Sequence, residues 1–100
     1  MNLSDINNIE GNAESEADYF KSLQSAINSG TAWSFQGSYG RAMMGAIEAG
    51  QCCLGRSGAR DYYGNYIPSR TEVKRGTKGS LAFVREQSGD RHARMIGRVK

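Results

Sequence analysis

The sequence predicts an α+β domain with two packed helices, a loop rich in glycine, tyrosine and arginine, and a C-terminal antiparallel β-hairpin. Two observations support this fold class. Apolar residues recur at helical spacing in the first half, and an aromatic and β-branched run near the C-terminus precedes a turn. A chain of 100 residues has room for one hydrophobic core. We therefore expect a single domain over residues 15–100, preceded by a flexible acidic leader over residues 1–14.

The first helix is expected over residues 16–28. Ser15 and Asp18 have the spacing of a capping arrangement at a helix N-terminus. Apolar residues then follow on one side at helical spacing, namely Tyr19, Phe20, Leu23, Ala26 and Ile27. Gly30 comes directly afterwards, and glycine readily adopts the left-handed conformation that ends a helix.

A second helix is expected over residues 39–54, after the capping residue Ser38. Its apolar stripe would consist of Met43, Ile47 and Leu54. Glycine costs about 1 kcal/mol in a helix interior. Because Gly45 and Gly50 fall inside this predicted helix, we expect a close contact between two helices to offset that cost.

Three further elements are expected in the last third of the chain. Ser69 and Glu72 have capping spacing, which predicts a short helix over residues 70–75. Residues 81–85 are rich in strand-forming side chains, residues 87–90 read as a turn, and residues 92–99 alternate between small or apolar and mostly basic side chains. This pattern predicts the C-terminal hairpin, whose apolar face would rest on the two helices.

Charge is distributed unevenly between the two halves of the chain. Residues 1–50 carry six acidic and two basic side chains, whereas residues 51–100 carry four acidic and eleven basic ones. The halves are therefore −4 and +7, which gives the net charge of +3. A basic segment of this density attracts polyanions or an acidic protein surface, so binding is the first functional hypothesis.

The stretch from Gly55 to Pro68 interleaves tyrosine with arginine. Such a surface can stack on bases, contact phosphates or form the hot spot of a protein interface. The same residues also suit a folded loop, in which each tyrosine packs its ring and leaves its hydroxyl in water. Both readings stay open. The candidate contact residues are Arg56, Arg60, Tyr62, Tyr63, Tyr66, Arg70, Lys74, Arg75, Lys78, Arg94 and Arg98.

No catalytic, metal or cofactor motif is recognised in the sequence, so the chain is not expected to be an enzyme. Cys52 and Cys53 are adjacent and far from His92, the single histidine, which is a poor spacing for a zinc site. They are expected to be reduced structural thiols. The glycine-rich segments match neither a Walker loop nor a dinucleotide fingerprint. The sequence has no apolar run long enough to cross a bilayer and no signal-peptide pattern, which predicts a cytoplasmic protein.

The stretch RDYYGNYIPSR, followed by GTKGS, resembles small accessory proteins of temperate bacteriophages that take over host functions, including anti-CRISPR proteins. The resemblance extends over about residues 38–86. It implies a non-catalytic protein of the bacterial host cytoplasm that docks on a nucleic-acid-processing defence complex, such as a CRISPR effector or a nuclease, and inhibits or modulates it. The alternative is a small basic DNA- or RNA-binding protein. The expected partner is a host protein or ribonucleoprotein, nucleic acid and a homodimer remain open, and no membrane partner is expected.

Overall fold

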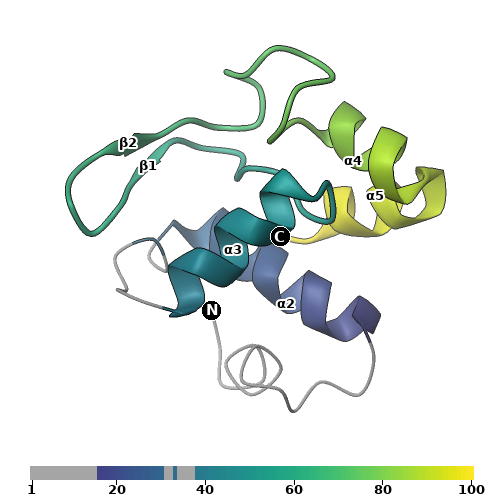
Figure 1. Ribbon diagram of the computed structural model, residues 1–100, viewed down its shortest axis with the longest axis horizontal. Helices are drawn as coiled ribbons and strands as arrows, with labels where there is room; N and C mark the ends of the chain where they lie inside the picture. The colour runs from purple at the N-terminus through teal and green to yellow at the C-terminus, as the bar shows by residue number, and fades with distance from the viewer. Residues whose placement is uncertain (1–15, 31–32, 34–37) are drawn as a thin grey trace.

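The computed structural model describes residues 16–30, 33 and 38–100. Within these residues the fold is mostly helical (Figure 1). The helices are α2 (Glu16–Ser29), α3 (Ser38–Glu48), α4 (Leu81–Ser88) and α5 (Asp90–Arg98). A two-stranded antiparallel sheet pairs β1 (Ala59–Arg60) with β2 (Tyr66–Ile67). The predicted leader over residues 1–14 lies outside the described residues.

The described helices share one hydrophobic core. Each contributes side chains that are almost completely removed from solvent, together with the segment that follows α3. The largest of these are Leu23, Ile27, Met43, Ile47, Cys52, Cys53, Leu54, Val84 and Ile96. Trp33 is also buried. None of the described helices is both long enough and apolar enough to cross a membrane.

Helix α2 agrees closely with the helix predicted over residues 16–28. Glu16 and Asp18 occupy its first turn, where negative charge interacts favourably with the helix dipole. Leu23, Ala26 and Ile27 form its buried apolar side, as their spacing predicts.

Helix α3 ends at Glu48, six residues before the predicted end at Leu54. The cause is Gly50, which has a φ of +76° and turns the chain out of the helix. The amides of Gln51 and Cys52 both donate to the carbonyl oxygen of Ala46, at 2.9 and 3.1 Å, and close the helix end. A close contact was predicted at both Gly45 and Gly50. Gly50 has one, with Gln87 of α4, but it lies outside α3. At Gly45 a Cβ would meet nothing within 4 Å.

The prediction of an α+β fold with a C-terminal β-hairpin is wrong, because residues 81–98 form the helical pair α4 and α5 (Figure 1). Ser80 caps α4: its Oγ accepts from the amide of Phe83 at 3.1 Å. Gly89, with a φ of +94°, then separates the two helices within one residue. A cap and a left-handed glycine at these positions favour helix, against the strand propensity of the intervening residues.

The burial of α5 shows why the strand reading failed. In a strand, Ala93 and Ile96 would point to opposite faces, but both are fully buried here. They lie three residues apart on the same side of a helix. Arg94 pairs with Asp90 one turn away, at 2.7 Å, which is also a helical spacing. When a short segment fits both the helical and the strand periodicity, tertiary packing decides which of the two forms.

The short helix predicted over residues 70–75 is also wrong, because the backbone forms turns there. The capping contact itself is made: the Glu72 carboxylate accepts from the amide of Ser69 at 2.6 Å. However, Gly76 has a φ of +87° and stops the chain after one turn. Val73 is the one apolar side chain of this segment that packs against the core, and a single anchor does not offset the cost of nucleating a helix of six residues.

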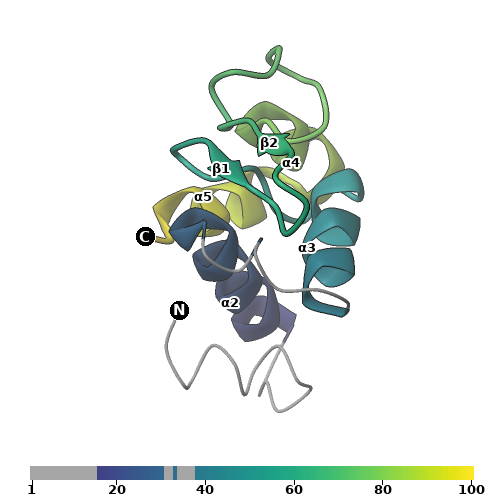
Figure 2. The same cartoon turned by 90° about the vertical axis from the view of Figure 1, so that its left-hand side faces the viewer.

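The sheet lies in the middle of the chain, not at its end. Ala59 pairs with Ile67 and Arg60 with Tyr66, so the loop between them holds five residues. Figures 1 and 2 both place this hairpin above α2, and Figure 1 shows its tip extending to the left of the helices. Ala59 and Ile67 pack against the core and anchor its base.

Candidate binding surfaces

The tip of the hairpin is held in shape by one carboxylate. Oδ1 of Asp61 accepts from the amides of Tyr63 and Asn65, both at 2.9 Å. The backbone closes the same loop: Asp61 N donates to Asn65 O at 3.0 Å, and Gly64 N to Asp61 O at 3.1 Å. Two strands of two residues each are only marginally stable by themselves. The hydrogen bonds of the loop therefore hold the tip, and with it the side chains that the tip carries, in position.

Three tyrosines on this hairpin are exposed to solvent, by 55% at Tyr62, 75% at Tyr63 and 52% at Tyr66. The rings of Tyr62 and Tyr63 pack edge to face with centroids 5.1 Å apart. The guanidinium of Arg60 lies 5.8 Å from the Tyr66 ring centroid, and its Nη1 donates to the carbonyl of Gly64 at 3.0 Å. We call Arg60, Tyr62, Tyr63 and Tyr66 the tyrosine hairpin. Clustered exposed aromatics of this kind are typical of interaction surfaces.

The hydroxyl group of Tyr66 is hydrogen-bonded to the carboxylate of Glu72. It lies 2.8 Å from both carboxylate oxygens and donates to them. This bond raises the pKa of Tyr66, while the Ser69 amide and then the Tyr66 hydroxyl lower the pKa of Glu72 below its usual 4.5. A lowered acid pKa stabilises the fold at neutral pH, and that stability is lost only as the pH falls below 4.5.

Replacing Glu72 with glutamine should bring the pKa of Tyr66 back toward 10, because the charged acceptor that favours the protonated hydroxyl is removed. Tyrosinate absorbance at 295 nm, followed from neutral to alkaline pH, measures this shift. The matched control is Glu86→Gln, which removes an exposed carboxylate on α4. Superimposable curves for wild type and Glu72→Gln would contradict the assigned bond.

A second surface lies on α5. Arg91, Arg94 and Arg98 line one groove of about 450 Å³ together with Met95 and with Lys21 of α2. We call this the α5 groove. Two of its cations have acidic neighbours: Arg94 pairs with Asp90 at 2.7 Å, and Lys21 lies 4.0 Å from Asp18. The described residues provide no ion pair for Arg91 or Arg98 within 4.0 Å, so the groove keeps a positive potential.

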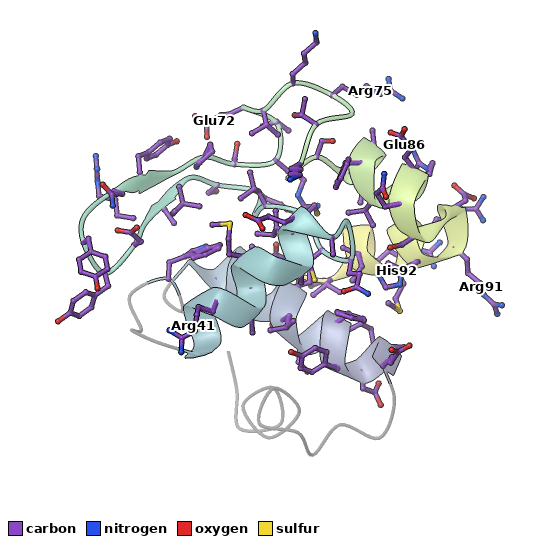
Figure 3. All side chains as sticks on the ribbon, in the orientation of Figure 1. Arg41, Glu72, Arg75, Glu86, Arg91 and His92 are labelled. Carbon is purple, nitrogen blue, oxygen red and sulfur yellow. The ribbon has the colours of Figure 1, made fainter. Side chains whose placement is uncertain are left out.

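A third group of cations follows the hairpin in the chain. Lys74, Arg75 and Lys78 are exposed on the loop that leads into α4. In Figure 3, Arg75 projects from this loop, whereas Arg91 projects from a different side of the molecule. The predicted contact residues are therefore divided among separate surfaces.

Two of the predicted contact residues, Arg70 and Arg56, make hydrogen bonds to residues far away in the chain. Arg70 donates from Nε to the carbonyl of Leu54 at 2.9 Å and from Nη2 to Oδ1 of Asn28 at 3.0 Å. Arg56 donates to the carbonyl of Gly97 at 3.0 Å but remains exposed. Arg70 thus connects the hairpin's C-terminal side to α2.

Sequence reasoning did not include Lys21 among the contact residues, since it lies in the acidic half of the chain. Arg91 joins Arg94 and Arg98 because positions separated by three, four and seven residues share one helix face. A strand would place Arg91 on the opposite side. Helical spacing of the C-terminal arginines was the signal that could have identified this surface.

The thiols are part of the packed interior, and the histidine is half-buried beside it. Cys52 and Cys53 are fully buried and unlinked, and burial, followed by the neighbouring thiol, raises the pKa of Cys52 to about 12. His92 lies 2.8 Å through Nε2 from the carbonyl of Gln51 and packs edge to face on Phe20. Within the described part of the chain, no three histidine, cysteine or acidic side chains are grouped closely enough to hold a metal ion.

No protein-family model, curated protein or solved structure matches this chain. Its function must be inferred from its own surfaces.

Proposed function

We propose that the protein is a non-catalytic binding protein that docks on a host nucleic-acid-processing defence complex, such as a CRISPR effector or a nuclease, and inhibits or modulates it. The single observation that supports this proposal is the tyrosine hairpin. Its aromatic side chains are more than half exposed, yet hydrogen bonds of Asp61 and Glu72 hold the loop in place.

The energetics of association favour such a surface. Ordering a mobile loop costs free energy on binding, and a loop that is already braced avoids much of that cost. Tyrosine has few rotatable bonds and offers both an apolar ring and a hydroxyl, so it buries a large area at low entropic cost. Tyr62 and Tyr63 stand side by side at the tip and supply the anchor of the proposed interface.

The kind of partner is proposed from two sources. The sequence between residues 38 and 86 resembles accessory proteins of temperate phages, which act by occluding host machines. The positive charge of the second half favours a partner that contains nucleic acid or presents an acidic surface. The alternative function, direct binding of DNA or RNA, is supported by the separate cation cluster of the α5 groove.

Replacing Tyr62 and Tyr63 together with alanine should weaken partner binding at least about 30-fold, because truncating a hot-spot residue costs about 2 kcal/mol or more. The wild-type chain is immobilised, a nuclease-treated bacterial lysate is passed over it, and a stoichiometric partner is expected to be retained. The purified partner is then titrated against both proteins. Circular dichroism should show unchanged folding, since both rings project into solvent.

The matched control is Glu86→Gln, on the exposed side of α4, which should leave the affinity unchanged. Equal affinity for the tyrosine variant and wild type would overturn the role of the hairpin. Loss of the partner on nuclease treatment would favour direct nucleic-acid binding instead. Infection of a CRISPR-protected host provides the functional readout: expression of the wild-type chain should raise the plating efficiency of the targeted phage, and expression of the tyrosine variant should not.

A further inference from the structure

We propose that the α5 groove binds the sugar-phosphate backbone of a nucleic acid strand. This inference goes beyond docking through the tyrosine hairpin and does not depend on it, because the two surfaces share no residue. It rests on four cations from two helices that converge on one groove, Lys21 of α2 and Arg91, Arg94 and Arg98 of α5.

The spacing of the arginines suits a regular polyanion. From Arg91 to Arg98 an α-helix advances about 10.5 Å along its axis, with Arg94 between them. Phosphates of one DNA strand follow each other at about 3.4 Å along the duplex axis, so this face of α5 spans about three of them. Lys21 adds a fourth cation from the opposite wall of the groove.

The electrostatic balance of the groove also favours an anionic ligand. Its lining contains four cations and no acidic side chain. Asp90 is shared between Arg94 and Arg85, so it neutralises only part of their charge. Lys21 has Asp18 at 4.0 Å, whereas the described residues give Arg91 and Arg98 no ion pair. Positive charge is therefore left over in the groove, and a bound polyanion would neutralise it while releasing its own counterions.

The groove continues into a neighbouring hollow of about 600 Å³ between α2 and α5, which shares Arg91 and Met95 with it. Glu16 lines that second hollow together with Phe20 and His92. A carboxylate repels phosphate, so the phosphate contacts are confined to the α5 groove. The apolar side chain of Met95 forms the boundary between the two.

An acidic protein surface is the competing occupant. It fits less well, because the α5 groove lacks the large aromatic anchor that dominates most protein interfaces. Arginines at regular helical intervals match the repeating phosphate groups of a nucleic acid strand, to which each guanidinium can donate two parallel hydrogen bonds.

The test is a salt titration of binding to fluorescein-labelled 20-mers, one duplex and one single-stranded, measured by anisotropy between 50 and 200 mM KCl. Four phosphate contacts predict a logarithmic slope of about −3.6 for the duplex or about −2.8 for the single strand. The double variant Arg91→Gln, Arg98→Gln should reduce the duplex slope to about −1.8. Lys21→Gln alone, on the other helix, should reduce it by about 0.9.

The matched control is Arg75→Gln, Lys78→Gln, which removes the same charge from the loop before α4 and should leave the slope unchanged. Equal losses for the two double variants would mean that net charge alone drives binding, and would overturn the site. Absence of oligonucleotide binding at 50 mM KCl would overturn it as well. Displacement of the oligonucleotide by an equal charge of poly-glutamate would assign the groove to an acidic protein instead.

These outcomes are separate from those of the hairpin test. The tyrosine variant should retain the oligonucleotide salt slope, and the arginine variant should retain the nuclease-resistant partner. A negative result for one surface therefore does not contradict the proposal for the other.

Discussion

Replacing Gln24 with leucine should lower the free energy of unfolding by about 2–6 kcal/mol, the largest loss that we expect from a single substitution. Gln24 is fully buried on α2 and binds both backbone groups of Cys53. Its Oε1 accepts from the Cys53 amide and its Nε2 donates to the Cys53 carbonyl, each at 2.9 Å. Leucine would leave that amide and that carbonyl buried without partners, at about 1–3 kcal/mol each.

The loss should spread beyond Cys53, because Gln24 also donates to Asn28 at 3.0 Å. Asn28 in turn accepts from Arg70 and donates to the carbonyl of Val99 at 2.8 Å. One buried side chain thus supports a network that joins α2 to the segment after α3 and to the end of α5.

Urea denaturation followed by circular dichroism measures this effect. Glu86→Leu is the control: it places the same leucine at an exposed position of α4 and should change stability by less than about 0.5 kcal/mol. If Gln24→Leu were as stable as the control, the two bonds to Cys53 would not contribute to the fold.

Replacing Gly50 with alanine should destabilise the protein by about 2–5 kcal/mol. The φ of +76° at this position costs an L-residue about 1–2 kcal/mol. A Cβ would also lie 2.5 Å from Cβ of Gln87, so α4 would have to move away from the end of α3. Overpacking of this kind typically adds about 1–3 kcal/mol.

Gly45→Ala, inside α3 and five residues before Gly50, provides a control of opposite sign. A Cβ at Gly45 meets nothing within 4 Å, and alanine is the better helix former by about 1 kcal/mol. Thermal unfolding should therefore rank Gly45→Ala above wild type and Gly50→Ala well below it. The same melting temperature for both variants would contradict the close contact between Gly50 and Gln87.

The sequence predicted those parts of the fold whose signals agree. In α2, acidic residues at the start, apolar spacing and a following glycine all indicate one helix, and the structure has it. In the C-terminal region the signals conflict. Phe83 and Val84 favour a strand, whereas the Ser80 cap and the left-handed Gly89 favour helices, and packing of Val84 and Ile96 in the core decides the outcome.

The candidate surfaces follow the same division. Tyr62, Tyr63 and Tyr66 are close in the chain, so their cluster was visible in the sequence. The α5 groove depends on the helical phase of Arg91 and on the packing of α2 against α5, which brings Lys21 near. The packing of α2 against α5 joins residues far apart in the chain, so no local sequence pattern indicates it.

The bond between Tyr66 and Glu72 has a mechanical consequence. Glu72 lies two residues before Lys74, so the bond connects the tyrosine hairpin to the loop that carries Lys74, Arg75 and Lys78. A partner bound to the rings would therefore also have a fixed position relative to the backbone at Lys74. Because the pKa of Glu72 is lowered and that of Tyr66 is raised, the hydroxyl stays a donor to an ionised carboxylate at neutral pH, and the coupling is lost only when acid protonates Glu72 or alkali ionises Tyr66.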